Sequence, residues 1–446
     1  MNTTPENALE EAGKHVFVAG VGDTAEKLSA LNMKYGLAKI HHYQKARGFS
    51  PDAVFIGSPD TTVTRNINRW TQGMGYGGIL QWSGDFSILD IKPNGCGMLM
   101  GLLPQRVSRE VVENRWKNLQ GKKISLQSRD LQWDIETGNH FLSLCVPMVE
   151  QEKYHWRLPW DGDVFILHSS GKEFRGETNI GPGLYWDRSE KLRRTMQKHS
   201  TPWGDLYVLE DKHAEEYHDH CMEVHSFQMK RRELLAKKLL GDFEILFNGT
   251  HQGIHSPGTA VLGCYKFDTS IKQRAHMICG PQNPDYPMAC PLTLRPDLPI
   301  PLLGPLDNFS AEAINELGWT DRLTEITKGE RIKKANILPH GGGTAYPYLE
   351  CPWTCEEKKE RLFGAAVSFN GDGKDFSLRR RNSLLEKLGQ APAIELDEAG
   401  KRVSFGNPRE LPFTYRGEEV LHRTLSYKMG RELGRLQPLW SIGGET

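Results

Sequence analysis

The sequence contains no long apolar segment, and this absence limits the class of protein. Nowhere do eighteen consecutive apolar residues occur, and the first residues hold no basic region followed by an apolar run. A transmembrane helix needs about 20 apolar residues, and a secretion signal needs the basic and apolar regions that are missing here. We therefore expect a soluble cytoplasmic protein with no membrane partner.

Cysteine is scarce, and charge of either sign is not in excess. Eight cysteines are scattered over 446 residues, which argues against a disulfide framework and for reduced thiols. A functional cysteine is thus expected to be a metal ligand or a nucleophile. Lys plus Arg and Asp plus Glu both total 56, so bulk charge does not indicate a nucleic-acid partner, although a local basic patch could still bind one.

The apolar pattern predicts a mixed α+β protein. Hydrophobic residues make up 38% of the chain and aromatic residues 9%, which is typical of a globular protein. Neither an internal repeat nor a low-complexity linker divides the sequence. We predict a single large domain over residues 1–446, with helices at 24–35, 108–119, 208–240 and 309–334 and strands near 16–20, 53–57, 73–80, 86–91, 140–146, 163–167, 260–267 and 275–279.

One histidine stands directly before three glycines, in the run from Ile337 to Pro347. Glycines 341 to 343 can adopt positive φ and allow another group to approach closely. His340 on such a loop could face a phosphate or a carbonyl group without obstruction and react with it. The alternative is an ordinary tight turn in which His340 is merely the first residue.

Five further residues follow apolar runs in a way that favours metal binding. Asp90 and Cys96 lie on a loop after one strand, His140 and His168 at strand ends, and His251 after another apolar run. Alternatively, Asp90 caps a turn, Cys96 is buried and each histidine is structural. One carboxylate, one thiolate and three imidazoles are suitable ligands for one or two divalent ions of intermediate softness, such as manganese or zinc.

Two other groups of candidate zinc ligands are interpreted as structural. His218, Cys221 and His225 have helical spacing and could share one helix face, but no Cys-x-x-Cys loop completes a zinc site there. Cys351 and Cys355 could form half of a site, but a second cysteine pair is missing.

Taken in order, these motifs resemble those of the RtcB family of RNA ligases. The resemblance rests on Asp90-Ile91 with Cys96-Gly97-Met98, on Gly138-Asn139-His140-Phe141, on His168-Ser169, on His251-Gln252 and on His340-Gly341-Gly342. It covers about residues 50–350 and leaves 351–446 with little likeness. It implies an RtcB-like catalytic domain with a metal centre between sheets.

The resemblance also implies a reaction and a role for each residue. Cys96 would bridge two manganese ions, one held also by Asp90 and His140 and the other by His168 and His251. His340 would accept GMP from GTP, with Asn139 and the glycines 341 to 343 contacting the nucleotide. The GMP would then activate an RNA 3′-phosphate or 2′,3′-cyclic phosphate end for joining to a 5′-hydroxyl end, as in tRNA halves or broken RNA.

The sequence departs from the family pattern at several positions. Residues 92 to 94 form an insertion between Asp90 and Cys96, Ser143 replaces a glutamate that helps to hold guanine, and Thr344 replaces an arginine. The C-terminal lysine that contacts guanine is not evident. This pattern predicts a divergent member with altered nucleotide preference.

Two other functions remain open at this point. The first is a metal-dependent phosphoesterase that forms no guanylate intermediate, and the second is an inactive RNA-end-binding protein on the same scaffold. Segments 191–198, 230–238 and 379–381 are basic and are candidates for contact with the RNA backbone.

Overall fold

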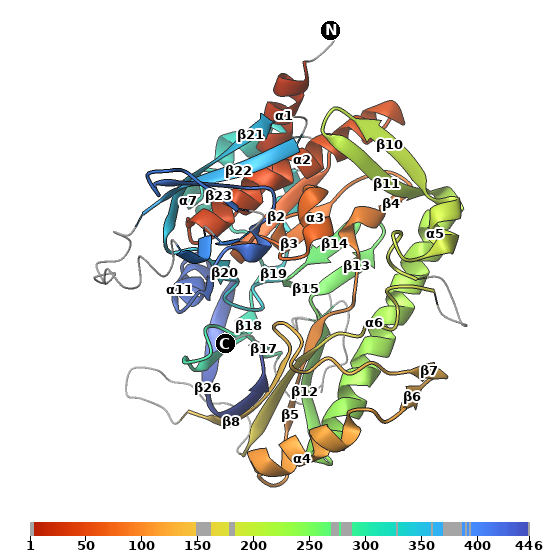
Figure 1. Cartoon of the computed structure of the whole chain (residues 1–446), viewed down its shortest axis with the longest axis vertical. Coiled ribbons are helices and arrows are strands. Elements are labelled where there is room, and N and C mark those ends of the chain that lie inside the picture. Colours follow the sequence, from red (N-terminus) through yellow and green to blue (C-terminus); the bar gives the residue numbers. More distant parts are fainter. Residues whose placement is uncertain are drawn as a thin grey trace.

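The computed structural model describes residues 4–148, 162–177, 183–268, 276–277, 288–326, 329–357, 360–368, 386–388, 390–391 and 394–444. It shows a mixed α+β architecture in which two larger sheets and several small ones are joined by a long helix (Figure 1). Within these residues no helix combines the length and the apolar character that a membrane span requires. The α+β prediction is confirmed, whereas the division into domains remains a prediction.

The largest sheet has seven strands in the order β12-β5-β9-β8-β26-β18-β17. Its strands are β12 (Glu244–Thr250), β5 (Gly97–Leu102), β9 (Val164–Ser169), β8 (Phe141–Pro147), β26 (Gly430–Gly443), β18 (Ile300–Pro305) and β17 (Cys290–Pro291). Alternate side chains point to opposite faces, as the period of a strand requires. On one face Leu99, Leu142 and Leu167 pack with helix residues Leu235 and Leu239.

The second sheet has five strands in the order β1-β2-β3-β14-β13. They are β1 (Val16–Val18), β2 (Val54–Thr62), β3 (Tyr76–Gln81), β14 (Thr259–Leu262) and β13 (Gln252–Ser256). Helix α2 (Thr24–Ala46) packs on this sheet, where Leu37 and Ile40 share a core with Phe55 and Leu80. The helix begins after Asp23, whose side chain accepts a hydrogen bond from the Glu26 amide and so caps the N-terminus.

Smaller elements complete the molecule. The remaining sheets are formed by β4 (Phe86–Ile88), β10 (Gln197–Thr201) and β11 (Gly204–Glu210); β15 (Tyr265–Asp268), β16 (His276–Met277) and β19 (Ile337–Leu338); β21 (Leu349–Glu357), β22 (Glu360–Val367), β23 (Ile394–Leu396) and β24 (Arg402–Phe405); β20 (Thr344–Ala345) and β25 (Thr414–Tyr415); and β6 (Ser125–Leu126) and β7 (Arg129–Asp130). The other helices are α1 (Pro5–Lys14), α3 (Ile67–Thr71), α4 (Arg109–Leu119), α5 (Glu190–Thr195), α7 (Ala311–Glu316), α8 (Thr320–Glu325), α9 (Gly329–Lys333) and α11 (Glu419–Ser426), with short 3₁₀ turns at Leu89–Ile91 and Pro408–Glu410.

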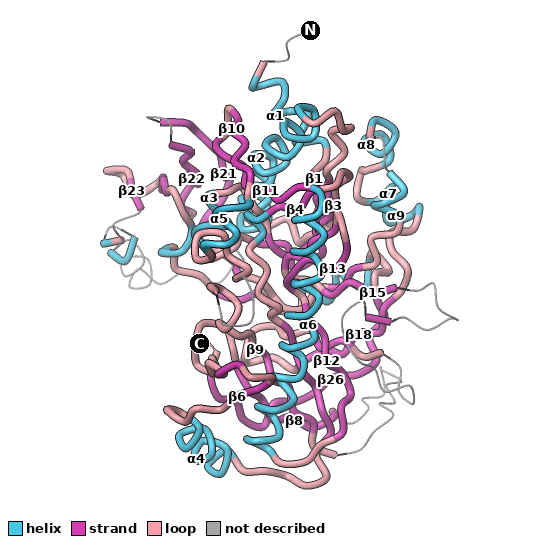
Figure 2. The backbone as a smooth tube through the Cα atoms, turned by 90° about the vertical axis from the view of Figure 1, so that its right-hand side faces the viewer, coloured by secondary structure: helices cyan, strands magenta, loops and turns pink. Residues whose placement is uncertain are grey.

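Helix α6 (Asp211–Leu240) runs along both larger sheets (Figure 2). It confirms the helix expected at 208–240, although residues 204–210 belong to strand β11. The buried Arg231 and Arg232 correct the expectation that the whole of segment 230–238 could contact RNA, since both side chains are 0% exposed. Buried cations are retained where partners compensate their charge, and the Arg231 guanidinium donates to Asp134 and Glu173.

Two other predictions need adjustment. The helix expected at 309–334 is divided into α7, α8 and α9, because Gly318 adopts a φ of +65° that ends the first of them. The helix expected at 24–35 extends to Ala46. The basic segment 379–381 lies outside the described residues.

Candidate metal centre

Four of the predicted metal ligands meet at one end of four neighbouring strands. His251 follows β12, Cys96 precedes β5, His168 lies in β9 and His140 precedes β8. These strands are adjacent in the seven-stranded sheet, and their register pairs Met98 with His168 and His168 with Phe141. The pairing therefore brings residues distant in sequence to one sheet edge.

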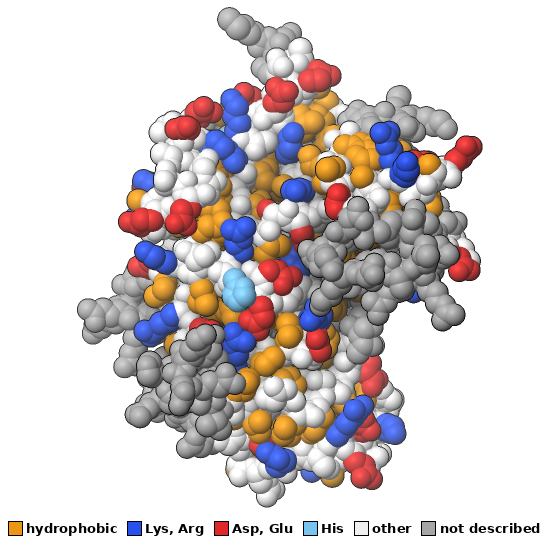
Figure 3. All heavy atoms as spheres, turned by 90° about the vertical axis from the view of Figure 1, so that its left-hand side faces the viewer, with side chains coloured by type: hydrophobic (Ala, Val, Ile, Leu, Met, Phe, Trp, Pro, Cys, Tyr) orange, Lys and Arg blue, Asp and Glu red, His pale blue; other side chains and the backbone are white. Residues whose placement is uncertain are grey.

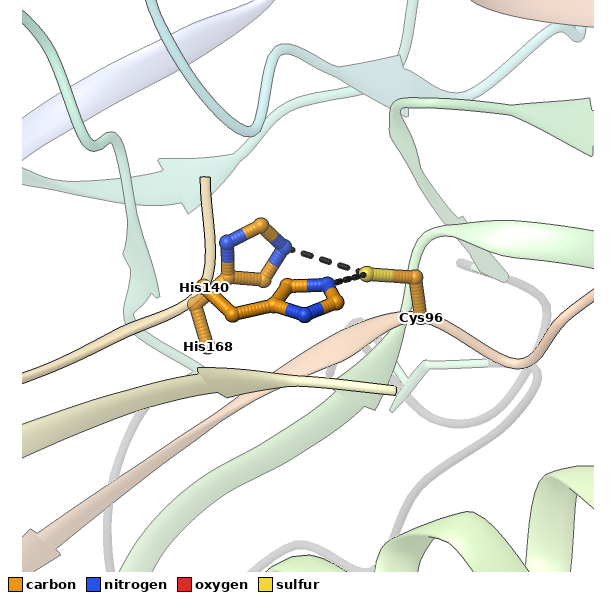
Figure 4. Close-up of side chains that lie close together, drawn as sticks. All are labelled: Cys96, His140 and His168. Carbon is orange, nitrogen blue, oxygen red and sulfur yellow. Dashed lines mark hydrogen bonds between the residues drawn. The ribbon is translucent and has the colours of Figure 1, made fainter. Parts of the chain in front are cut away.

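Cys96, His140 and His168 form the tightest group (Figure 4). The Cys96 Sγ atom lies 3.4 Å from His140 Nε2 and 3.2 Å from His168 Nε2. Within the described part of the chain, this is the one group of three or more His, Cys, Asp or Glu donors close enough to hold a common ion. Its thiol and imidazole donors are the set that suits zinc and similar metals.

The second nitrogen of each of these two histidines has a fixed partner. His140 Nδ1 lies 2.8 Å from a carboxylate oxygen of Asp134, and His168 Nδ1 donates to the backbone carbonyl of Asn139 at 2.9 Å. Such partners fix the ring tautomer and orient the remaining nitrogen toward a metal. Asp134 is in turn held by the Ser169 hydroxyl and by the Arg231 guanidinium.

Charge is concentrated in the same group. Burial raises the pKa of the Cys96 thiol, but the neighbouring imidazoles of His168, His140 and His251 outweigh burial and bring the pKa well below its ordinary value. Burial lowers the pKa of His140, but Asp134 and Cys96 outweigh it and raise the pKa to about 10. The metal-free pair is therefore a thiolate beside an imidazolium.

His251 links this group to His340. Its Nε2 atom lies 3.3 Å from His168 Nε2, and its ring lies 4.2 Å from the His340 ring, centroid to centroid. Burial, with a smaller contribution from His340, lowers the pKa of His251 to about 3 and keeps it neutral. Since His251 joins β12 to β13, it stands where the two larger sheets meet.

The loop of His340 is fixed by a carboxylate that sequence reasoning missed. Asp60 in β2 accepts hydrogen bonds at one oxygen from His340 Nδ1 at 2.8 Å, from the His340 amide at 3.0 Å and from the Gly341 amide at 3.3 Å. The Nδ1 atom is thereby occupied, and Nε2 remains for chemistry. The glycines behave as expected, since Gly343 has a φ of +71° and a Cβ on Gly342 would lie 2.5 Å from the Arg416 carbonyl oxygen.

A cavity of about 530 Å³ brings these groups together. Cys96, Asn139, His140, His168 and the loop 340–343 all line it. Its described lining includes five arginines and neither aspartate nor glutamate; the arginines are Arg65, Arg69, Arg175, Arg295 and Arg409. Such a lining favours an anionic ligand, and phosphate above all. By contrast, basic and acidic side chains are interspersed over the surface in Figure 3.

Asp90 lies outside the cluster, which differs from the expected ligand set. Its buried carboxylate accepts a hydrogen bond from the Tyr207 amide at 3.3 Å and interacts with Lys39 and Lys92. The insertion explains this position: Lys92 adopts a φ of +47° that ends the 3₁₀ turn at Leu89–Ile91, and three more residues separate it from Cys96. Burial raises the pKa of Asp90 to about 6.

Among the described residues, the other candidate zinc ligands form no such group. Cys221 is fully buried in an apolar core with Tyr217 and Val224, and burial raises its pKa. Cys351 is exposed, and the side chain of Cys355 lies outside the described residues.

Comparison with known protein families and with curated proteins finds no match to this chain.

Proposed function

We propose that this protein is a metal-dependent RNA ligase of the RtcB type, which uses GTP to join a 3′-phosphate or 2′,3′-cyclic phosphate end to a 5′-hydroxyl end. The observation that carries the proposal is the pairing of His340 with Asp60. The His340 ring centroid lies 4.2 Å from that of His251, and His340 lines the same cavity as Cys96, His140 and His168. An oriented imidazole beside a set of metal donors is the arrangement expected of a nucleophilic histidine.

In the first step, His340 Nε2 attacks the α-phosphorus of GTP. A nitrogen–phosphorus bond forms while the bond from the α-phosphorus to the bridging oxygen breaks, and pyrophosphate leaves. Positive charge develops on the imidazole during attack, and the Asp60 carboxylate on Nδ1 stabilises it. The three hydrogen bonds to Asp60 also hold the ring in place, so that little reorganisation is needed.

In the later steps the histidine acts as a leaving group. A 2′,3′-cyclic phosphate is first opened by water, which breaks the bond to the 2′-oxygen and leaves a 2′-hydroxyl and a 3′-phosphate. An oxygen of the RNA 3′-phosphate then takes the GMP from His340, and the neutral imidazole is restored. The 5′-hydroxyl oxygen of the second RNA end then attacks the 3′-phosphorus, GMP departs and a phosphodiester remains. Arg175 and Arg409 line the cavity and are candidates for contact with the phosphates of both substrates, and Asn139 lines the same cavity.

The donor set fits one divalent ion at Cys96, His140 and His168. Bound there, an ion supplies positive charge that offsets charge on the reacting phosphates. The five residues of the two-ion scheme are not assembled, because Asp90 lies elsewhere, and no step here depends on a second ion.

The decisive experiment is incubation of the purified protein with a divalent metal and α-labelled GTP, with α-labelled ATP in parallel and His340→Ala as the control. We expect an acid-labile labelled adduct that His340→Ala does not form. Addition of RNA with a 3′-phosphate should then release the label and, with a 5′-hydroxyl partner, yield joined RNA.

Two other results would each support a different function. A protein that binds metal and hydrolyses phosphate esters, but forms no adduct with either nucleotide, would be a phosphoesterase. A protein that binds RNA ends, but neither metal nor nucleotide, would be an inactive end-binding protein.

A further inference from the structure

We infer that the centre holds a single ion of the zinc class, bound by Cys96, His140 and His168 with one position open to the cavity, and that Asp90 takes no part in binding it. This inference deepens the proposed function, since it rests on that proposal's assignment of a metal centre to this cavity. It departs from the two-manganese scheme that the family resemblance implies.

The spacing of the donor atoms suits a single ion. Zinc binds sulfur at about 2.3 Å and imidazole nitrogen at about 2.05 Å, so a tetrahedral site separates sulfur from nitrogen by about 3.6 Å and two nitrogens by about 3.4 Å. In this structure Cys96 Sγ lies 3.4 Å and 3.2 Å from the two histidine nitrogens. Both sulfur–nitrogen distances are therefore close to those that a single ion requires, and all three donor atoms lie within 4.8 Å of one another.

The two histidine rings are oriented toward the sulfur. Asp134 holds His140 by Nδ1, and the Asn139 carbonyl holds His168 by Nδ1, so both rings present Nε2 toward the sulfur. Asp134 is itself fixed by Arg231, which is 0% exposed. Partners of this kind are characteristic of metal-binding histidines, because they fix the ring so that the other nitrogen faces the ion.

The described donor group contains a thiol and two imidazoles and no carboxylate. Manganese favours carboxylate, carbonyl and water ligands, whereas thiolate and imidazole favour zinc. Among the described residues, no Asp or Glu belongs to the group of donors. Asp90 faces Tyr207, Lys39 and Lys92, and the oxygens of Asp134 are taken up by His140, Ser169 and Arg231.

Too few ligands remain beside this group for a second ion. His251 is the remaining predicted ligand beside the cluster. Its Nε2 lies 3.3 Å from His168 Nε2, but it does not belong to the group of donors that all lie close to one another. A second ion would have this one imidazole of its own and would have to share the thiolate or His168 with the first. One unshared ligand is too few for a stable ion, since catalytic metal sites typically have three protein ligands and one open position.

The test is metal stoichiometry, measured independently of activity. The whole protein is stripped with a chelator and dialysed against Zn²⁺, Co²⁺ or Mn²⁺, and bound metal is counted by mass spectrometry. We expect one Zn²⁺ or Co²⁺ per chain and little retained Mn²⁺. We also expect the Co²⁺ form to show the intense visible absorption of a tetrahedral site together with a thiolate-to-metal charge-transfer band.

Variants separate the two schemes. Cys96→Ser should lose the ion and the charge-transfer band, while Asp90→Asn should keep both, and Cys351→Ser serves as the matched cysteine control because Cys351 is exposed. Two ions per wild-type chain, tighter retention of Mn²⁺ than of Zn²⁺, or loss of an ion in folded Asp90→Asn would overturn the inference. The wild-type count decides the question even where a variant fails to fold.

The two proposals fail in different ways. One ion per chain without a labelled His340 adduct would refute the ligase and leave the metal inference standing. A His340 adduct in a protein that binds two ions would refute the metal inference and leave the ligase standing.

Discussion

Replacing Asp60 with asparagine should slow the labelling of His340 without unfolding the protein. The amide oxygen can take the place of the carboxylate oxygen that accepts from His340 Nδ1 and from two backbone amides. The amide nitrogen then faces the Ser58 hydroxyl, which now donates to the other carboxylate oxygen and can accept instead. The variant thus removes the negative charge and keeps the shape.

The expected magnitude follows from the difference between charged and neutral hydrogen bonds. A bond to a charged group contributes about 1.5–3 kcal/mol and a neutral one about 0.5–1.5 kcal/mol, so the Nδ1 bond loses roughly 1–2 kcal/mol. Because the imidazole gains positive charge during attack, this loss falls mainly on the transition state. Since about 1.4 kcal/mol corresponds to a factor of ten, the rate of adduct formation should fall about 5- to 30-fold.

The assay is single-turnover formation of the labelled His340 adduct at saturating nucleotide, so that binding does not limit the rate. Asp163→Asn is the control, because Asp163 pairs with the 62% exposed side chain of Arg106 and does not line the cavity. If folded Asp60→Asn formed the adduct at the wild-type rate, the role given to Asp60 would be refuted. An equal fall in rate in Asp163→Asn would show that the effect is not local.

Three further predictions concern stability and the loop. Arg231→Met removes the buried cation that pairs with Glu173 and shares Asp134 with His140, and chemical denaturation should show a loss of about 3–5 kcal/mol. In the metal-free protein, the raised pKa of His140 and the lowered pKa of Cys96 have opposite effects on the pH dependence of stability. Their ordinary pKa values are 6.5 and 9.0. The His140 contribution to the unfolding free energy is present below pH 6.5 and is lost as pH rises toward about 10, whereas the Cys96 contribution is present above pH 9.0 and is lost as pH falls. Chemical denaturation of Cys96→Ser should therefore show only the decline from about pH 6.5 upward. Gly342→Ala, whose Cβ would lie 2.5 Å from the Arg416 carbonyl oxygen, should abolish the adduct while circular dichroism stays unchanged.

Sequence patterns were informative where local chemistry decides the outcome. Apolar residues at helical spacing predict the helix at 108–119, which begins after Ser108. Three successive glycines predict the tight loop at His340, and histidines at strand ends predict that Cys96, His140 and His168 can meet. In each case the signal lies in a few consecutive residues.

The contacts that the sequence could not supply join distant parts of the chain. Asp60 lies 280 residues before His340, and Asp134 lies 97 residues before Arg231. Each is a single acidic residue near apolar ones, which is a weak signal without the sheet register. At Asp90 the local motif predicts a metal ligand, but the carboxylate interacts with Lys39 and Lys92 instead.

The position of β26 has a consequence for how the protein is made. Among the described strands it has the highest residue numbers, but it lies between β8 and β18, and the Gly444 amide donates to the His140 carbonyl. The ribosome therefore synthesises Cys96, His140 and His168 long before the strand that completes their sheet. Until β26 is added, the open edge of β8 can pair with another chain. Metal loading before β26 joins would take place on an incomplete sheet, whereas loading afterwards would show that the sheet is complete.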